Sequence, residues 1–194
     1  MSVRRLHNAQ PEAFAFTDDN KVWAQTQIAK YPEGRQASAV IPLLWQAQKQ
    51  MGGWLPEPAM RHVADILDMP YIRVLEVASF YTMFQLAPVG EYLVQLCGTT
   101  PCWLRGADDL KAVCKDEIGG VGDISADGKF SWVEVECLGA CVNAPMVQIN
   151  DDFYEDLDAT SLRAVLESLR TGQTPKTGPQ SGRQSSEPSG VKDA

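Results

Sequence analysis

The chain has 194 residues, of which 44% are apolar and 22% charged, a composition typical of one or two globular domains. Its 25 acidic and 17 basic side chains give a formal net charge of −8, which argues against sequence-independent nucleic-acid binding and against docking on anionic lipid through a polybasic patch. The longest apolar run, residues 37–45, is interrupted by Ser38 and Pro42, so we expect a soluble protein without a membrane span.

Residues 1–15 form an N-terminal extension ahead of the first regular pattern. Arg4 and Arg5 lie near the start, but neither an apolar stretch nor a small-residue cleavage site follows them, as a signal peptide would require. We therefore expect the protein to stay in the compartment where it is made. In a chain that is not exported, five cysteines indicate metal or redox chemistry rather than structural disulfides.

Residues 16–87 carry the apolar periodicity of helices. One helix is expected around residues 20–30, a second between Ser38 as its N-cap and Gly52-Gly53, a third after Pro56 and a fourth after Pro70. The positions expected on the buried faces of the last three helices are Val40, Ile41, Leu44, Trp45, Met51, Ala59, Val63, Ile66, Leu67, Ile72 and Leu75. Because the connections are short, the segment is predicted to be a small helical bundle.

After Pro88-Val89-Gly90 the periodicity changes to the alternation of strands. The expected elements are a strand over 92–96 that leads into Cys97, a helix over 104–113, a strand over 130–136 that leads into Cys137, a hairpin of 146–149 with 153–154, and a helix over 162–169 that Gly172 ends. Residues 88–172 are therefore predicted to be a compact α/β layer on a small mixed sheet, which makes the whole chain an α+β protein.

Residues 173–194 differ in composition from the rest of the chain. They consist mainly of Gly, Ser, Pro and Gln, with Val191 as their only large aliphatic residue. Such a segment cannot bury enough apolar surface to offset the entropy lost on ordering. The sequence therefore predicts a disordered tail.

Four of the five cysteines form two close pairs, Cys97 with Cys102 and Cys137 with Cys141. Each pair begins where a predicted strand ends, so both can project from the same edge of the sheet. Four thiolates could hold a [2Fe-2S] cluster, with two sulfurs on each iron, or a structural zinc ion, with four sulfurs around one metal. The spacing leaves both open, whereas thiol oxidoreductase activity is disfavoured because neither pair has the Cys-x-x-Cys spacing.

Small residues in the two loops favour the cluster over zinc. Gly98, Thr99 and Gly139 leave backbone N–H groups free to point at sulfur, and such hydrogen bonds tune the potential of a cluster. The fifth cysteine, Cys114, falls on the apolar face of its helix and is expected to be buried, as His62 is expected to pack at the edge of the bundle.

An acidic run near the C-terminal end of the sheet could be taken for a calcium site. It lacks the central glycine and terminal glutamate of an EF-hand loop and is interpreted as a solvated face. Its members are Asp151, Asp152, Glu155, Asp156 and Asp158. The sequence shows no dinucleotide or phosphate-binding fingerprint either.

Two stretches, residues 127–131 (DGKFS) and 136–146 (ECLGACVNAPM), closely resemble the family of [2Fe-2S] E subunits of NADH:quinone oxidoreductase, respiratory complex I. Residues 52–56 (GGWLP) and 77–84 (VASFYTMF) are also similar to that family, and the resemblance spans roughly residues 16–169. The resemblance implies an N-terminal helical bundle over 16–87 followed by a thioredoxin-like ferredoxin domain over 88–172. In this family Cys97 and Cys102 would bind one iron of a [2Fe-2S] cluster, and Cys137 and Cys141 the other.

The resemblance also implies the role of the protein and its partners. The chain would carry one electron at a time and take it from the FMN of a neighbouring NADH-oxidising subunit, with no catalytic residue of its own. It would assemble with other complex I subunits, peripherally on the inner face of a bacterial membrane or on the matrix side of a mitochondrial one, without inserting into it. The alternatives are the diaphorase-module subunit of an NAD-linked formate dehydrogenase or hydrogenase and, in a different class, a structural zinc-binding interaction module.

Overall fold

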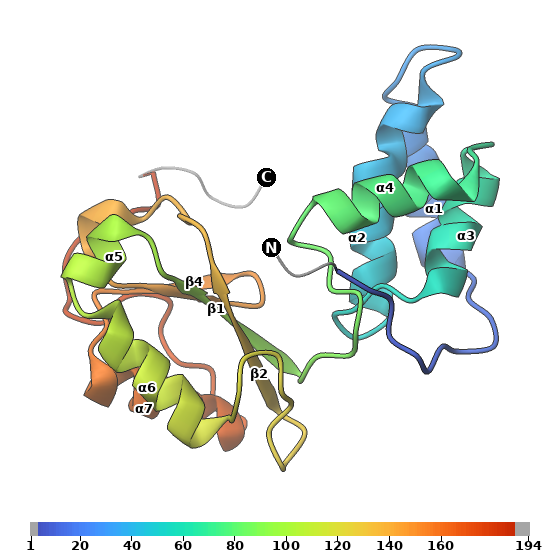
Figure 1. Ribbon diagram of the computed structural model, residues 1–194. Coiled ribbons are helices and arrows are strands. Elements are labelled where there is room, and N and C mark those ends of the chain that lie inside the picture. The colour runs from blue at the N-terminus through green and yellow to red at the C-terminus, as the bar shows by residue number, and fades with distance from the viewer. Residues whose placement is uncertain (1–3, 189–194) are drawn as a thin grey trace. The chain divides into compact units, whose positions relative to one another are not determined.

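The computed structural model describes residues 4–188 (Figure 1). The chain divides into two compact units between Val89 and Gly90, close to the junction at residues 87 and 88 that the change of periodicity predicted. One unit is helical and the other holds a five-stranded sheet, so the predicted α+β class is confirmed. No helix within residues 4–188 combines the length and the apolar character needed to cross a bilayer.

The first unit is built from α1 (Asp18–Ile28), the 3-10 turn η1 (Gln36–Ala39), α2 (Val40–Gln50), α3 (Glu57–Ile66) and α4 (Tyr71–Phe80). Thr17 caps α1, because its hydroxyl accepts a hydrogen bond from the Asn20 amide at 3.3 Å. Pro58 lies in the first turn of α3, where a missing N–H costs nothing. The expectation that Ser38 caps α2 is wrong, because Ser38 lies within η1 and α2 begins at Val40 without a side-chain cap.

The core of this unit is formed by one face of each of α2, α3 and α4. Its fully buried members are Leu43, Leu44, Ala47, Ala59, Met60, Val63, Val74 and Ala78, with Leu55 and Phe84 from the connections. Ile66 and Ile72, which were expected on the buried faces, are exposed over 38% and 56% of their surface. They lie at the ends of α3 and α4, where the helical stripe has already turned away from the neighbouring helices.

The long side chain of Arg4 stabilises the end of α4 and the segment that follows it. Arg4 donates hydrogen bonds to the carbonyls of Ala78, Ser79, Tyr81 and Phe84, which satisfy the last turn of α4 and the segment that follows it. Residues of the N-terminal extension therefore pack on the bundle rather than standing apart from it.

The second unit contains strands β1 (Tyr92–Cys97), β2 (Phe130–Val135), β3 (Val147–Ile149), β4 (Asp152–Glu155) and β5 (Gly178–Pro179) in the order β2-β1-β3-β4-β5. β1 is parallel to β2 and antiparallel to β3, β3 and β4 form the predicted hairpin, and β4 is parallel to β5. The helices are α5 (Thr100–Leu104), α6 (Ala107–Glu117), the 3-10 turn η2 (Cys141–Asn143) and α7 (Ala159–Arg170).

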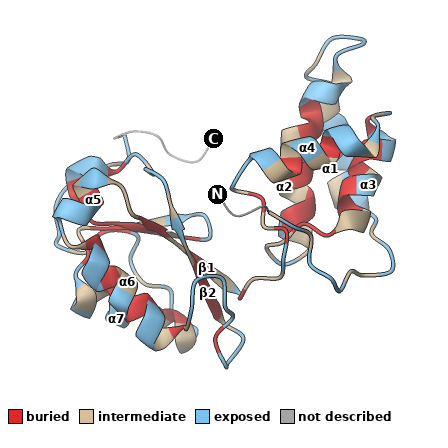
Figure 2. Ribbon diagram, viewed as in Figure 1, coloured by how far each residue is buried: buried red, intermediate tan, exposed pale blue. Residues whose placement is uncertain are grey.

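Helices α6 and α7 lie side by side and share one core with the sheet (Figure 1). Their buried faces carry Leu110, Val113 and Cys114 from α6, and Leu162, Val165, Leu166 and Leu169 from α7. Figure 2 shows the buried residues running along β1 and β2 and along one side of α6. The predicted strands, the hairpin and the last helix of this unit are confirmed, but the helix predicted over 104–113 is divided, because α5 ends at Leu104 and α6 begins at Ala107.

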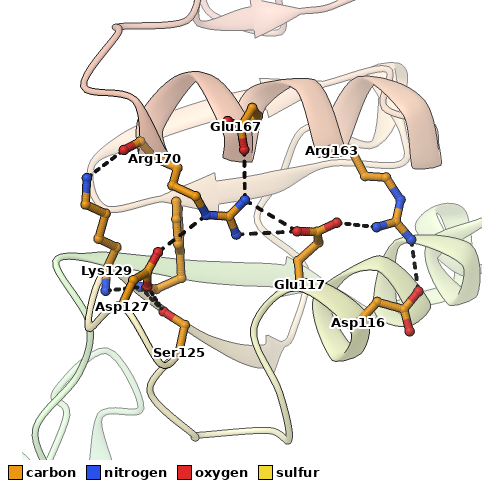
Figure 3. Close-up of polar contacts among 9 residues, drawn as sticks. Asp116, Glu117, Ser125, Asp127, Lys129, Arg163, Glu167 and Arg170 are labelled. Carbon is orange, nitrogen blue, oxygen red and sulfur yellow. Dashed lines mark hydrogen bonds and ion pairs between the residues drawn. The ribbon is translucent and has the colours of Figure 1, made fainter.

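An ion-pair network ties α6, α7 and the entry to β2 together (Figure 3). Glu117 at the end of α6 accepts from both Arg163 and Arg170 of α7, and Arg170 also pairs with Asp127 at 3.4 Å. The Arg170 guanidinium lies over the ring of Phe130, 5.4 Å from its centroid. Single exposed ion pairs contribute little, but a shared network of this kind holds the helix pair in register on the sheet.

Residues 173–188 do not form the disordered segment that their composition predicted. β5 pairs with β4, so that Tyr154 lies opposite Gly178 and Glu155 opposite Pro179, and the Gln180 amide donates to the Glu155 carbonyl at 2.9 Å. The segment is ordered by backbone and side-chain hydrogen bonds rather than by apolar burial, which composition cannot reveal. The rest of the predicted tail, residues 189–194, lies outside the described residues.

Candidate metal centre

The two cysteine pairs lie in loops that leave neighbouring parallel strands at the same edge of the sheet. Cys97 is the last residue of β1 and lies opposite Val135, the last residue of β2. Cys137 follows Val135 by two residues. The carboxyl ends of adjacent parallel strands therefore bring the first cysteine of each pair to one place, as the sequence predicted.

The first loop buries both of its sulfurs. Cys97 and Cys102 are exposed over only 2% and 1% of their surface. Thr99 precedes α5 and places its hydroxyl 3.3 Å from Cys97 Sγ, while Pro101 in the first turn of α5 sets the backbone that carries Cys102. The short helix thus turns the second sulfur back toward the first.

The second loop holds its sulfurs at the surface. Cys137 and Cys141 are exposed, and their Sγ atoms lie 3.4 Å apart. Gly139 adopts a φ of +89°, a conformation that side chains rarely allow, and this turn points its amide at Cys137 Sγ at 3.4 Å. The positive φ therefore requires the glycine, whereas a Cβ at this position would meet no atom within 4 Å.

Contacts between the loops bring the pairs together. The Leu138 amide of the second loop donates a hydrogen bond to the Cys97 sulfur. Electrostatic interaction across the loops contributes to raising the pKa of Cys102, through Cys141, and that of Cys141, through Cys97. Within residues 4–188, no three His, Cys, Asp or Glu side chains are arranged around a single ion position. The sulfurs lie as two pairs, Cys97 with Cys102 in the first loop and Cys137 with Cys141 in the second.

As free thiols, Cys97, Cys102 and Cys141 have pKa values that their surroundings shift in different directions. Burial raises the pKa of Cys97, but hydrogen bonds from Thr99 and Leu138 outweigh it and leave this pKa below the ordinary value. Burial, together with the hydrogen bond that Cys102 donates to Cys97, raises the pKa of Cys102 to about 12. The hydrogen bond to Cys137, and then burial, raise the pKa of Cys141. Cys102 and Cys141 therefore hold protons that a bound metal must displace.

Charged and apolar side chains surround the cysteine loops. Glu134 lies against Gly98 and pairs with Lys111 at 2.9 Å. Trp103 and Leu104 on α5 and Val142 in η2 are exposed over 56%, 70% and 69% of their surface. Leu104 was expected at the start of the apolar stripe of the helix over 104–113 and is instead exposed. Trp103 and Val142 were not singled out, because an apolar residue beside a cysteine carries no local signal of whether it is buried.

Two residues set aside in the sequence are placed as expected. Cys114 is completely buried in the core, and burial raises its pKa to about 12. His62 accepts a hydrogen bond from the Phe16 amide at 3.3 Å, and its ring contacts those of Phe14 and Phe16 edge-on. Both side chains are structural, and neither contributes to the cysteine site.

The interpretation of the acidic run as a solvated face is wrong for two of its five members. Asp151, Asp152 and Asp158 are exposed, but Glu155 is exposed over only 1% of its surface and the Asp156 side chain over 7%. The reason is the segment after α7, whose hydroxyl, amide and guanidinium groups cover these two carboxylates. Charge alone does not predict exposure where a distant segment supplies donors.

Comparison with known proteins identifies the family. The family model of the thioredoxin-like [2Fe-2S] ferredoxins matches residues 24–170. The E subunit of NADH-quinone oxidoreductase from Rickettsia bellii (strain RML369-C) is 52% identical over 164 residues, which cover 84% of this chain and 98% of the relative. An E subunit of the same enzyme from Rhizobium meliloti (strain 1021) is 53% identical over 98% of this chain and 71% of its own.

Solved structures show the same fold at lower identity. The air-oxidized NAD+-reducing [NiFe]-hydrogenase matches 67% of this chain with a TM-score of 0.57 and 24% identity. This chain spans only 23% of that hydrogenase chain, so the likeness concerns the fold alone. From the family match and the extent of identity to its relatives, the chain belongs to the thioredoxin-like [2Fe-2S] ferredoxin family and, within it, to the E subunits of NADH-quinone oxidoreductase.

Proposed function

We propose that this chain is an electron-transfer subunit of an NADH-quinone oxidoreductase and carries one [2Fe-2S] cluster. Cys97 and Cys102 bind one iron, and Cys137 and Cys141 bind the other. The observation that carries this proposal is the meeting of two cysteine pairs at the carboxyl ends of the parallel strands β1 and β2. Membership of the ferredoxin family supports it.

The donor set fits such a cluster. Four thiolates supply two sulfurs to each iron, and the cluster when bound gains or loses one electron. The amides of Leu138 and Gly139 and the hydroxyl of Thr99 point at the sulfurs of Cys97 and Cys137. Because such hydrogen bonds stabilise added negative charge, these groups favour the reduced state and tune the potential.

The electron comes from the FMN of a neighbouring subunit that oxidises NADH. The second cysteine loop is exposed, and the exposed apolar side chains of Trp103, Leu104 and Val142 lie beside the cysteines at the same end of the unit. A partner that covers this end can bring its flavin near the sulfurs. The chain then works as a peripheral subunit on the inner face of a bacterial membrane, or on the matrix side of a mitochondrial one, together with the other subunits of the complex.

The fold of the NAD+-reducing hydrogenase supports a second candidate, the equivalent subunit of a soluble NAD-linked enzyme. The relatives that are about half identical over nearly their whole length favour the quinone-reducing complex. Copurification separates the two, since this chain should be recovered with a flavin-bearing subunit and with membrane subunits. In that assembly NADH should reduce the cluster, whereas NADH added to the isolated chain should not.

Substitution of each of the four cysteines by serine tests the ligand assignment, with Cys114→Ala as the matched control. The wild-type chain purified without oxygen should contain two irons and two sulfides and give a spin-one-half EPR signal only after reduction. Each of the four variants should lose iron, sulfide and signal, and Cys114→Ala should keep them. One zinc ion per chain without sulfide would instead identify a structural zinc module.

A further inference from the structure

The carboxylate of Glu155 lies buried at the end of β4 with hydrogen bonds to two separate segments. Its Oε2 accepts from Asn143 Nδ2 at 2.6 Å and from the Ser186 amide at 3.1 Å, and its Oε1 accepts from the Ser186 hydroxyl. A buried carboxylate is costly unless such donors replace water. Glu155 therefore joins η2, at the end of the second cysteine loop, to residues 178–186, which we call the C-terminal strap.

Asn143 is the link between Glu155 and the cysteine loop. It follows Cys141 by two residues in the same 3-10 turn and is exposed over only 1% of its surface. Its side-chain amide donates to Glu155 and to the Gln184 carbonyl at 2.8 Å, and its own carbonyl accepts from the Asp156 amide at 2.8 Å. Asn143 is thus held by the end of β4 and by the strap at once.

A second set of contacts reaches the residue next to Cys141. Arg183 of the strap donates to Asp156 Oδ1 at 3.0 Å and to the Val142 carbonyl at 3.3 Å. The Ser181 hydroxyl donates a hydrogen bond to the other carboxylate oxygen of Asp156, Oδ2, at 2.7 Å. The strap therefore contacts both residues that follow Cys141, although it is separated from them by about forty positions in the sequence.

We propose that Glu155 and the C-terminal strap are positioning elements for the second cysteine loop. They act through Asn143, whose hydrogen bonds to both of them fix the backbone of the turn that carries Cys141. The cysteine loop itself is exposed and turns through the left-handed Gly139, so its sulfurs depend on neighbouring segments for their place. Fixing Cys141 in this way keeps the second iron bound and sets the geometry of its sulfurs. This inference rests on the proposed function, because it concerns the cluster that the four cysteines bind.

The test uses the full chain carrying its cluster and four variants. Glu155→Gln keeps the volume but removes the negative charge and leaves one acceptor oxygen in place of two, and Ser186→Ala removes the hydroxyl that Ser186→Thr retains. Glu187→Gln is the matched control, since it makes the same chemical change one residue after Ser186 in an exposed side chain. The readouts are the g-values of the reduced cluster by EPR and the rate of bleaching by an iron chelator. Hydrogen exchange of β1 and β2 reports whether each variant is folded.

Glu155→Gln should bleach roughly tenfold faster than wild type and shift the g-values, as losses beyond the direct metal ligands do. Ser186→Ala should show the same change more weakly, while Ser186→Thr and Glu187→Gln should match wild type. If Glu155→Gln fails to fold, the comparison of Ser186→Ala with Ser186→Thr decides. Unaltered bleaching and g-values in folded Ser186→Ala and Glu155→Gln would overturn this inference alone. A wild-type chain without iron and sulfide would overturn the proposed function together with it.

Discussion

An alanine at Gly90 would place its Cβ 2.5 Å from the carbonyl carbon of Phe130 and 2.8 Å from the Phe130 Cα. Both are backbone atoms at the start of β2, where the ladder holds them. The Gly90 amide donates to the Ser131 hydroxyl at 3.1 Å, and the Tyr92 amide donates to the Lys129 carbonyl at 2.7 Å. Neither strand can yield without breaking these bonds. We expect Gly90→Ala to lower the free energy of unfolding by about 3 kcal/mol, the upper part of the range for overpacking.

Gly98→Ala provides a matched comparison, because it too would create an overlap. There the new Cβ would overlap the Glu134 carboxylate and lie 2.7 Å from its Cδ. This side chain is flexible and 46% exposed, so it can turn into solvent. The cost is the ion pair with Lys111, which keeps a second partner in Asp108 at 3.2 Å. Exposed pairs of this kind contribute about 0.5 kcal/mol.

The full chain is unfolded in urea, and unfolding is monitored by hydrogen exchange of peptides from residues 90–170. This readout gives the free energy of unfolding of the second unit separately from that of the bundle. A loss of about 3 kcal/mol shifts the folding equilibrium roughly a hundredfold, whereas a loss of about 0.5 kcal/mol shifts it only about twofold. The two variants should therefore separate clearly. Equal losses, or a larger loss for Gly98→Ala, would show that the backbone contacts of Gly90 do not determine the cost of the substitution.

Other substitutions and reagents test the electrostatics of the second unit. Arg170→Met should cost about 1 kcal/mol through the lost pair with Glu117, and less in 1 M salt, so urea midpoints that differ equally at both salt concentrations would contradict it. Asp158→Ala should cost about 1 kcal/mol at neutral pH, since Asp158 caps α7 and the Ser161 amide lowers its pKa. The stability that the ionised Asp158 contributes is fully present above the pKa of Asp158 in the unfolded chain, and it is lost as the pH falls through the lower pKa of the folded chain. The melting temperatures of wild type and Asp158→Ala should therefore converge in acid. In the cluster-free chain, iodoacetamide at pH 8 should label exposed Cys137 but leave Cys114 unlabelled by peptide mass spectrometry, because burial raises its pKa to about 12.

Much of the fold could be predicted because the signals are local. The apolar stripes of α2, α3, α6 and α7 and the alternation in β1 and β2 follow from the repeats of the helix and the strand along a short window. The cysteine pairs could be placed for the same reason, since Cys97 ends β1 and Cys137 follows β2. Within the helices, the ends were misjudged, as for Ser38 and for Ile66, where a stripe or a cap competes with the neighbouring turn.

The sequence therefore predicts the α+β class, most of the elements and the four cysteines that we propose as ligands of the metal centre. The groups that surround these cysteines depend on contacts between segments that are distant in the sequence. The Leu138 amide reaches Cys97 across two loops, and the strap reaches Asn143 and Glu155 from positions 41 and 31 residues away. The physical reason is that hydrogen bonds between distant segments leave no periodic trace, and a polar segment can be ordered by buried acceptors that its own composition does not contain.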